Sequence, residues 1–415
     1  MVNVGLVGIG TIGSGVVKIL EKNSGLIEKR TGVNIVLKKV CDLKTDSAEK
    51  LGVVDKLVND YNELVGDKEI DVVVELIGGY EPARTVILSA LQNGKHVVTA
   101  NKAVIAKHGN ELFDAAVKNK VNLCFEAAVG GCIPIIRTLQ QSYVSENIKS
   151  IYGILNGTTN YILTKMKEGM SYEDALAKAQ KLGFAEPDPS FDVQGLDAAQ
   201  KLAILSSLAF NYKMKDDIYT EGIAELSKFD LEYADKLGYG VKLLAIAKKV
   251  DGEIELRVHP TMIPKKHELC SVVNEFNAIY VTGENISECM LYGKGAGELP
   301  TATVVVGDIV NIGCKNLPAF FSDVKIKDIE SVKSRYYLRC RVLDEPGVLA
   351  KIAKTLGDNN ISISGVQQKE IDKDTVPLII LTHEAVEKDV RKAIKDMDKL
   401  DVVKKNVVVI RIEDM

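Results

Sequence analysis

The 415-residue sequence has no tryptophan, few prolines and no apolar run of the ~20 residues that a membrane-spanning helix needs. Its first ten residues are apolar, but their glycines would interrupt the core of a signal peptide. The seven cysteines show neither CxxC spacing nor clustered histidines, so we expect reduced thiols rather than a zinc site or a disulfide framework. No basic stripe marks a nucleic-acid or membrane surface. These absences predict a cytoplasmic protein without nucleic-acid or membrane partners.

What is present is the composition of an ordinary globular protein. Hydrophobic residues make up 46% and charged residues 27% of the chain, and the net charge of -4 is close to balanced. There is no low-complexity segment of the kind that marks a disordered chain. The length exceeds one compact core, so we expect several domains.

The first 134 residues alternate strand-like and helix-like segments. Val2–Val7 and Asp71–Leu76 are apolar runs typical of strands buried on both faces, and Ser14–Lys29 has helical periodicity. This alternation predicts an α/β fold, a Rossmann-type doubly wound parallel sheet, over residues 1–134.

The pattern changes after this first domain. Helical stretches between residues 158 and 236 precede strand-like segments between 241 and 282, which predicts an α+β domain for substrate binding and dimerisation over 135–318. The charged stretch 319–335 is predicted to be a linker. Residues 336–415 then show the order β-α-β-β-α-β, which is the ferredoxin-like arrangement.

A GIGTIG turn directly follows the first strand and opens the next helix. Gly8 permits the tight turn, Gly10 lets the backbone approach a pyrophosphate, and Gly13 lets helix and strand pack closely. The helix N-terminus suits the phosphates, so we also expect Thr11 and Ile12 in this site. A tight turn without a ligand is the alternative, but the strand–turn–helix context favours dinucleotide binding.

The residue that follows the second strand bears on the choice of cofactor. The carboxylate of Asp42 could accept a hydrogen bond from a ribose 2′-hydroxyl and would repel a 2′-phosphate, which favours NAD. Lys38 and Lys44 lie nearby in the sequence and leave NADP open.

Four further segments carry a specific resemblance. They are Thr99–Lys102, Asn156–Ile162, Glu186–Lys201 (EPDPSFDVQGLDAAQK) and Gly293–Ala302. Together they resemble homoserine dehydrogenases, and the similarity runs over the whole chain. It implies reversible NAD(P)-dependent hydride transfer between L-homoserine and L-aspartate 4-semialdehyde, in the biosynthesis of threonine, methionine and isoleucine.

Asp197 and Lys201 lie four residues apart and share one face of a predicted helix. A surface salt bridge is the ordinary explanation, but this helix is largely apolar, and a poorly solvated lysine has a lowered pKa and can pass a proton. The resemblance also places Lys102 at the reaction centre, beside the cofactor, and the sequence leaves open which lysine moves the proton. Lys102 could equally be a solvated residue at the start of a helix.

The same resemblance assigns the substrate contacts. Glu186, Asp192 and Asp197 match acids of the family that bind the substrate, whose ammonium group needs a carboxylate partner. Gly157 and Thr158 could serve the substrate or the nicotinamide, or the turn that contains them could simply cap a helix.

Two other positions come from the same comparison. Gly297 belongs to a segment that resembles the loop closing over the cofactor, although an ordinary glycine-rich turn would have the same composition. Phe191 stands where many relatives carry an acid or a polar residue, and this departure puts the substrate contacts around Asp192 in doubt.

The resemblance also implies a site for a monovalent cation. Glu126 could offer a carboxylate, while Val129, Gly131 and Ile133 could offer backbone carbonyls to a hard ion such as Na⁺. Such an ion would be structural, and the residue types by themselves do not require a metal.

Residues 336–415 resemble an ACT domain, a regulatory module that binds amino acids. The match rests on the turn at Asp344–Leu349, whose free N–H groups suit a ligand carboxylate, and on Asn359–Ile363. The resemblance implies threonine, the end product, as effector, and pairing of such modules implies a homodimer or a higher homo-oligomer. An ACT domain that only dimerises is the alternative.

Two other functions fit parts of the sequence. Prephenate and phosphoglycerate dehydrogenases can also carry ACT tails, but the EPDPSFDVQGLDAAQK segment and the order of the motifs argue against both. A non-catalytic amino-acid sensor built on an enzyme scaffold would be expected to lack Lys102, Asp197 or Lys201, and all three are present.

Overall fold

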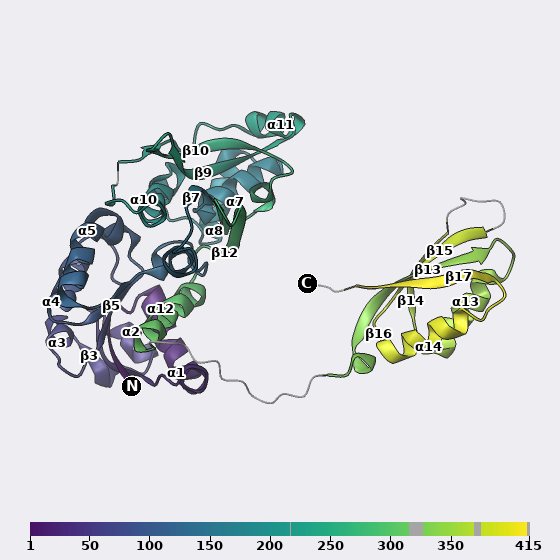
Figure 1. Ribbon diagram of the computed structural model, residues 1–415, viewed down its shortest axis with the longest axis horizontal. Coiled ribbons are helices and arrows are strands. Elements are labelled where there is room, and N and C mark those ends of the chain that lie inside the picture. The colour runs from purple at the N-terminus through teal and green to yellow at the C-terminus, as the bar shows by residue number, and fades with distance from the viewer. Residues whose placement is uncertain (216, 315–326, 369–374, 413–415) are drawn as a thin grey trace. The chain divides into compact units, whose positions relative to one another are not determined.

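The computed structural model divides the chain into two units, residues 1–320 and 321–415 (Figure 1). The described residues are 1–215, 217–314, 327–368 and 375–412. Each unit has a buried hydrophobic core of its own. Within the described ranges, no helix is both long and apolar enough to cross a membrane.

The first unit begins with a six-stranded parallel sheet of order β3-β2-β1-β4-β5-β6. Its strands are β1 (Val2–Val7), β2 (Ile35–Cys41), β3 (Leu57–Val58), β4 (Val72–Glu75), β5 (His96–Thr99) and β6 (Leu123–Cys124). This is the strand order of a Rossmann fold, in which the order reverses between β1 and β4 and opens a crevice for a dinucleotide.

Helices connect these strands and cover the sheet (Figure 1). They are α1 (Thr11–Thr31), α2 (Thr45–Lys50), α3 (Asn62–Val65), α4 (Ala83–Gln92) and α5 (Lys102–Asn119), with the short turn η1 (Val54–Lys56). Because helices pack on both faces, the central strand β4 is apolar until its last residue and is fully buried.

A second sheet of order β12-β11-β7-β9-β10-β8 follows, antiparallel except for the β10–β8 pair. Its strands are β7 (Ile148–Ile154), β8 (Tyr219–Thr220), β9 (Tyr239–Val250), β10 (Glu253–Pro264), β11 (Phe276–Gly283) and β12 (Glu288–Lys294). The helices of this part are α6 (Ile135–Arg137), α7 (Gly157–Lys167), α8 (Tyr172–Lys181), α9 (Ser190–Val193), α10 (Leu196–Phe210) and α11 (Lys228–Lys236). The short turns are η2 (Glu126–Ala128), η3 (Thr138–Ser142) and η4 (Glu268–Ser271).

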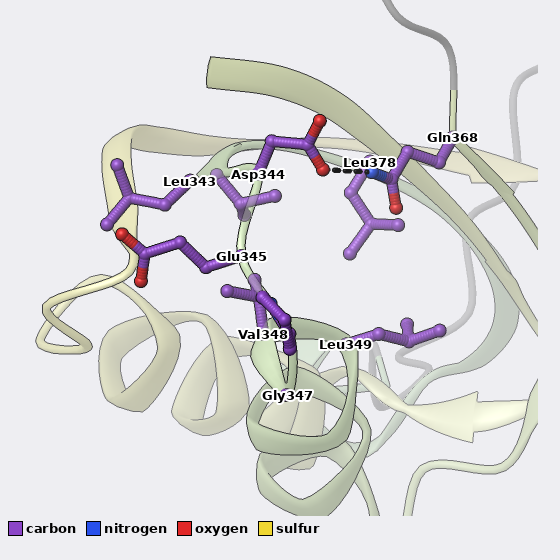
Figure 2. A pocket seen from close by; sticks show the side chains of 10 residues that line it. Leu343, Asp344, Glu345, Gly347, Val348, Leu349, Gln368 and Leu378 are labelled. Atoms are coloured by element: carbon purple, nitrogen blue, oxygen red, sulfur yellow. Dashed lines mark hydrogen bonds between the residues drawn. The ribbon is translucent and has the colours of Figure 1, made fainter. Parts of the chain in front are cut away.

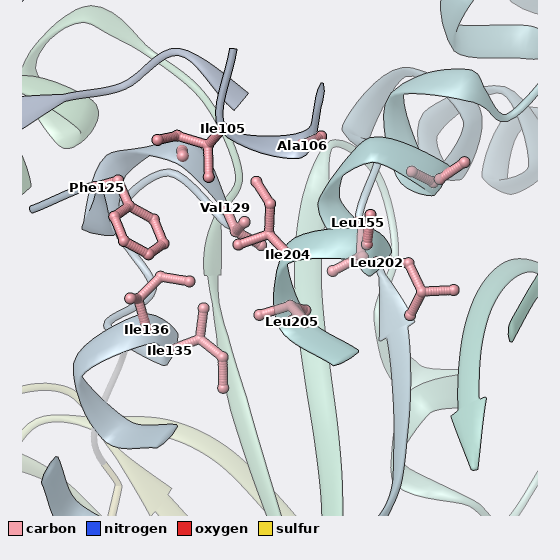
Figure 3. Close-up of a cluster of buried hydrophobic side chains, with 14 of the residues drawn as sticks. Ile105, Ala106, Phe125, Val129, Ile135, Ile136, Leu155, Leu202, Ile204 and Leu205 are labelled. Carbon is pink, nitrogen blue, oxygen red and sulfur yellow. The ribbon is translucent and has the colours of Figure 1, made fainter. Parts of the chain in front are cut away.

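Helix α10 joins the two sheets, because it packs against β7 and β9 and also against α5. Figure 3 shows its residue Ile204 beside Ile105 of α5 and Val129, while Leu202 points to the other side of the helix, and all of these residues are buried. The polar residues at the start of α10 are therefore held at the junction of the two sheets by a close-packed core.

Helix α12 (Glu298–Gly313) returns from the second sheet to the first, where it packs against α1. Ala302, Val305 and Ile309 are buried in the core of the parallel sheet. The helices are so close that a Cβ at Gly15 would lie 2.9 Å from the Cβ of Ala302. The boundary between residues 1–134 and 135–318 stays a prediction, with α12 completing the core of the former.

The second unit is an antiparallel sheet with two helices. Its elements are η5 (Ile329–Ser331), β13 (Lys333–Leu343), α13 (Val348–Asp358), β14 (Ile363–Gln368), β15 (Thr375–Thr382), β16 (Ala385–Val386), α14 (Glu387–Met397) and β17 (Val403–Ile412). Strand β13 lies between β15 and β17, and β14 is the outer neighbour of β15. The predicted β-α-β-β-α-β order is present, with the short β16 in addition, and the predicted fold class is confirmed.

Candidate active site

A cavity of about 840 Å³ lies where the two sheets of the first unit meet. This volume is in the range of pockets that hold a cofactor or a small ligand. Many of the site residues predicted from the sequence line it: Thr11, Ile12, Lys102, Gly131, Gly157, Thr158, Glu186, Asp192, Asp197, Lys201 and Gly297.

Two lysine side chains share one carboxylate in this cavity. Lys201 Nζ donates to Asp197 Oδ2 at 2.7 Å, and Lys102 Nζ lies 3.0 Å from Asp197 Oδ1. Lys201 also donates to the carbonyl of Leu155 at 2.7 Å. The Lys201 side chain is 11% exposed and that of Lys102 33%, so Lys201 is the more firmly enclosed of the two.

The start of helix α10 explains how Asp197 can carry a charge while it is buried. Burial by itself raises the pKa of Asp197, but the positive charges of Lys201 and Lys102 outweigh burial and hold the pKa below its ordinary value. Asp197 also lies in the first turn of α10, where the helix dipole favours an anion. The carboxylate is therefore ionised and fixes both ammonium groups.

The side chain of Asn156 belongs to the site, although the sequence did not predict a role for it. It caps α7, because its Oδ1 accepts a hydrogen bond from Thr159 N at 2.8 Å. Its Nδ2 donates to Asp192 Oδ1 at 2.7 Å and to Asp197 Oδ2 at 2.9 Å. An asparagine at a helix start is an ordinary cap in a sequence, so only the fold reveals its second role of joining the two acids.

The remaining predicted substrate residues differ in their surroundings. Asp192 is half-buried, and both its burial and the nearby charge of Asp197 raise its pKa. The Thr158 hydroxyl donates to the carbonyl of Phe184, so its side chain is already engaged. Gly157 packs against Glu275, whose carbonyl oxygen would lie 2.6 Å from a Cβ, and Glu186 is exposed at the cavity.

Phe191, the residue that departs from the family pattern, lies next to Lys102. Its ring centroid is 5.9 Å from Lys102 Nζ, within range of a weak cation–π contact. The ring is partly exposed and lines the cavity. The Phe191 side chain thus lies against Lys102 and has no polar group to offer a substrate.

The glycine turn has the geometry that a dinucleotide site requires. Gly8 has a φ of 94°, and a Cβ on Gly13 would lie 2.0 Å from the Gly8 carbonyl oxygen. A Cβ on Gly10, by contrast, would meet nothing within 4 Å. The fold itself explains Gly8 and Gly13, whereas Gly10 borders open space at the uncapped start of α1, where a phosphate would fit.

Asp42 lies beside this turn, directly after β2. Its Oδ2 accepts a hydrogen bond from Ile9 N at 2.7 Å, and its Oδ1 accepts one from Lys44 N at 2.9 Å. Each oxygen retains a further lone pair, so a contact to a ribose remains compatible with these bonds. Its predicted role toward the cofactor stays a prediction.

A second side chain that sequence reasoning missed is Glu75, the last residue of β4. It is 0% exposed, and its oxygens accept hydrogen bonds from Ile77 N and from Thr99 Oγ1, each at 2.7 Å. Burial raises its pKa. Because Thr99 Oγ1 also accepts from Asn101 N at 2.9 Å, Glu75 helps to fix the segment that ends in Lys102. The sequence did contain a signal for this residue, since an acid at the end of the apolar strand Val72–Val74 is unusual.

The segment predicted to hold a cation contains a buried acidic pair. Glu126 accepts hydrogen bonds from Ile136 N and Arg137 N, each at 2.7 Å, and Glu126 N donates to Asp308 Oδ2 at 3.0 Å. Arg137 also bonds Asp308 at 2.8 Å. Burial, with a further contribution from Asp308, raises the pKa of Glu126 to about 7. Within the described residues, no three His, Cys, Asp or Glu side chains cluster as metal ligands.

The second unit has a pocket of its own, of about 370 Å³, at the start of α13. Asp344, Glu345 and Gly347 line it, together with Gln368 of β14. Figure 2 shows Gln368 reaching Asp344, whose Oδ1 accepts its hydrogen bond at 3.1 Å. Gly347 has a φ of 89° and turns the chain into the helix.

A parallel sheet of Rossmann order, a phosphate-binding glycine turn and an enclosed lysine–aspartate–lysine group define an NAD(P)-dependent dehydrogenase. Comparison with known proteins then gives the family. Homoserine dehydrogenase profiles match residues 134–310 and, for the NAD-binding domain, 8–126, and an ACT domain profile matches 336–400. The chain belongs to the homoserine dehydrogenase family.

Individual relatives agree with this assignment. Homoserine dehydrogenase of Neisseria gonorrhoeae is 43% identical, with 100% of this chain and 99% of that protein covered. A crystal structure of a homoserine dehydrogenase from Thiobacillus denitrificans has a TM-score of 0.74 and 43% identity, covering 100% of this chain and 98% of that one. A hyperthermophilic archaeal homoserine dehydrogenase mutant in complex with NADPH has a TM-score of 0.65 and 30% identity, covering 75% and 97%.

These findings confirm the predicted family and enzyme class. The chain is an oxidoreductase of amino-acid biosynthesis with an NAD(P)-binding domain and a C-terminal ACT domain. The function predicted from the sequence, that of a homoserine dehydrogenase, is confirmed.

Proposed function

We propose that Lys201 transfers the proton in a reversible reaction between L-homoserine and L-aspartate 4-semialdehyde. The observation that carries this proposal is the enclosed ammonium group of Lys201, held at 2.7 Å by both Asp197 and the Leu155 carbonyl. An ammonium has three N–H donors, so one is left for the substrate oxygen. A nicotinamide cofactor supplies or accepts the hydride when it is bound.

Lys102 has a different role in this proposal. Among the described residues its one ion-pair partner is Asp197, and it is more exposed than Lys201, on the side of the cavity that α5 forms. Its positive charge polarises the carbonyl of the aldehyde and stabilises the developing alkoxide. Asp197 positions both lysines, and Asn156 keeps Asp197 in place.

The charged ends of the substrate suit two parts of the cavity. Asp192 and Glu186 are carboxylates at the cavity wall, and an ammonium group there would offset the burial of Asp192. The α-carboxylate suits the N-terminus of α7 at Gly157 and Thr158, where the first backbone N–H groups have no partner within the helix. These residues therefore place the reacting carbon next to Lys201.

The test is reduction of NAD⁺ and NADP⁺ by L-homoserine at 340 nm, with wild type and Lys201→Ala. We expect kcat to fall at least a hundredfold in the variant, within the ~10²–10⁴ range of a general acid–base group. Lys165→Ala is the matched control, because the Lys165 side chain is 15% exposed, pairs with Glu168 three residues further along at the end of α7, and does not line the cavity. Wild type that is folded yet reduces neither cofactor would refute the proposed reaction, and a Lys201→Ala variant with normal kcat would refute the role of Lys201.

We propose NAD as the preferred cofactor. The carboxylate of Asp42 lies beside the glycine turn and would repel a 2′-phosphate. The two cofactor arms of the same assay test the preference, since a higher kcat/KM with NADP⁺ would contradict it.

We also propose a structural Na⁺ next to the buried pair of Glu126 and Asp308. The carbonyls of Val129 and Gly131 are buried and accept no hydrogen bond from the described residues, whereas the Ile133 carbonyl already accepts one from Ile135. A cation would offset the burial of the Glu126 carboxylate and the nearby charge of Asp308, which together raise the pKa of Glu126. Replacing NaCl by choline chloride should lower Tm, and an unchanged Tm would argue against the ion.

For the second unit we propose threonine as effector. The ligand carboxylate would meet the N–H groups that begin α13, and Asp344 or Glu345 would meet its ammonium. We further propose that the enzyme is cytoplasmic and forms a homodimer or a higher homo-oligomer. Inhibition by L-threonine in the assay above and the mass measured by light scattering test the effector and the assembly. An uninhibited enzyme would favour an ACT domain that only dimerises.

A further inference from the structure

Asn277 is one of the residues that line the cavity, and its side-chain amide is left without a hydrogen bond. Its Nδ2 and Oδ1 are both buried with no partner among the described residues, and the residue is 0% exposed. A buried polar group without a partner is destabilising, and buried amides normally have their hydrogen bonds satisfied. Here one donor and one acceptor lie side by side, which suggests that a ligand completes them.

The backbone around Asn277 is held firmly from one side. Asn277 belongs to β11, where it pairs with Gly293 of β12. The loop that precedes it is tied down by Asn160, whose Nδ2 donates to the carbonyls of Val272 at 3.2 Å, Asn274 at 2.9 Å and Phe276 at 3.1 Å. The amide is therefore a fixed part of the wall and is pre-organised for a ligand.

The other side of the amide is covered by a small loop. A Cβ on Gly295 would lie 2.1 Å from Asn277 Nδ2, so only a glycine backbone fits over the amide. The loop ends at Gly297, which has a φ of 130° and begins α12. Because this loop carries no bulky side chain between these two glycines, it is the element that can yield to a planar group.

The position of Asn277 selects the ligand group. The cavity lining includes Thr11 at the predicted phosphate-binding turn and Lys201 at the proposed proton-transfer centre. Asn277 and Gly131 also line it, and both lie next to the backbone at Gly295. A nicotinamide ring has to lie between its phosphates and the reacting carbon. Its carboxamide carries one C=O acceptor and one NH₂ donor, which match the Asn277 amide in a pair of hydrogen bonds.

We infer that Asn277 binds the carboxamide of the nicotinamide ring and thereby positions the ring for hydride transfer. The inference rests on the proposed function. The substrate is a poorer match, because its ammonium group suits the carboxylates around Asp192. A metal ion is also a poorer match, since it would leave Nδ2 without a partner.

The test compares two cofactors on wild type and Asn277→Leu, which keeps the shape of the side chain but removes both hydrogen bonds. Calorimetry would give Kd for reduced NAD or NADP and for the 3-acetylpyridine analogue, in which a methyl replaces the NH₂. We expect Kd for the natural cofactor to rise about ten- to hundredfold in the variant, as for one or two lost hydrogen bonds. The preference for the natural cofactor over the analogue, which we expect in wild type, should be absent in Asn277→Leu. The Tm of the variant without cofactor should be equal to or higher than that of wild type.

Ser207→Ala is the control, because its buried hydroxyl also lacks a partner but lies outside the cavity lining. Its Kd values should match those of wild type. Asn277→Ser gives the same comparison if the leucine variant does not fold. An unchanged Kd, or a preference that persists in both Asn277 variants, would overturn the inference, whereas wild type that binds neither cofactor would instead refute the proposed function.

Discussion

A single buried carboxylate holds two lysines together in the proposed reaction centre. Asp197 forms an ion pair with each of two ammonium groups that would otherwise repel each other, and its pKa is held below the ordinary value because both lysines outweigh its burial. Its contribution to stability therefore depends on the charged form. Breaking a buried ion pair is costly because the partner is left with an uncompensated charge.

Asp197→Asn should lower the free energy of unfolding at pH 7 by about 3 kcal/mol. Because the pKa in the folded state lies below the unfolded value of ~3.9, the contribution of the carboxylate is fully present above ~3.9 and is lost progressively as the pH falls from there through the lower pKa of the folded state. Urea denaturation at pH 7 and near pH 3 would measure this, and the gap between wild type and variant should narrow at the lower pH.

Asp188→Asn is the matched control, since Asp188 is exposed and, among the described residues, accepts hydrogen bonds only from Ser190. It should change the free energy of unfolding by less than about 0.5 kcal/mol. A gap between wild type and Asp197→Asn that does not depend on pH would contradict the assignment of the stabilisation to the ionised carboxylate.

Lys242 is a residue whose buried charge is expected to destabilise the fold, in contrast to that of Asp197. Its Nζ is buried against Asn160 Oδ1 at 3.0 Å and against the Val272 carbonyl, and burial lowers its pKa to about 8. Lys242→Met should raise the free energy of unfolding at pH 7 by on the order of 1–3 kcal/mol, because the variant buries no charge.

The unfolded pKa of lysine is ~10.4, so between about pH 8 and 10 the unfolded wild type binds more protons and wild-type stability rises. The advantage of Lys242→Met should therefore shrink over this window in urea denaturation. The exposed Lys118→Met variant should show no such change. If Lys242→Met were the less stable protein at pH 7, the hydrogen bonds of the ammonium would outweigh its burial.

At the scale of elements, the turn between β1 and α1 contains glycines that are needed for two different reasons, packing within the fold and space for a ligand. Gly13→Ala would place a Cβ 2.0 Å from the Gly8 carbonyl oxygen and should cost about 2–3 kcal/mol of stability. Gly10→Ala meets nothing within 4 Å and has a φ of -66°, so its stability should match that of wild type.

The cofactor affinity should separate the same two variants. The Cβ of Gly10→Ala would occupy the space at the start of α1 that we predict for the pyrophosphate, so Kd for NAD(H) or NADP(H) should rise at least tenfold in a normally folded protein. Thermal melting and calorimetric titration measure the two effects. Normal affinity in Gly10→Ala would mean that the pyrophosphate does not approach this turn.

At the scale of the whole molecule, all proposed catalytic and cofactor residues belong to the first unit. The archaeal structure matches over 97% of its own length with 75% of this chain. Residues 1–320 alone should therefore retain kcat within about threefold and lose any response to L-threonine. The assay at 340 nm with both forms measures this, and circular dichroism checks the fold. A folded but inactive fragment would show that the second unit contributes to the active site.

Much of the fold was predictable because its signals are local. The apolar run at Val72–Val74, the glycine turn and the helical periodicity of α1 each depend on neighbours a few residues away. The β-α-β-β-α-β order of the last unit was predictable for the same reason. The packing of α12 on α1 was not, because an apolar helix face does not specify which partner buries it.

The sequence by itself determined the family, the glycine turn predicted to bind the nucleotide, and the segment that carries the proposed reaction centre. It also determined the pairing of Asp197 with Lys201, because residues four apart in a helix lie next to each other on one face. Only the tertiary structure decided that Lys102, at the start of α5, joins this ion pair, that Asn156 links Asp192 and Asp197, and that the amide of Asn277 finds no partner among the described residues. The physical reason is that these contacts depend on how α5, α7, α10 and β11 pack around a shared core, which residue order along any one element does not encode.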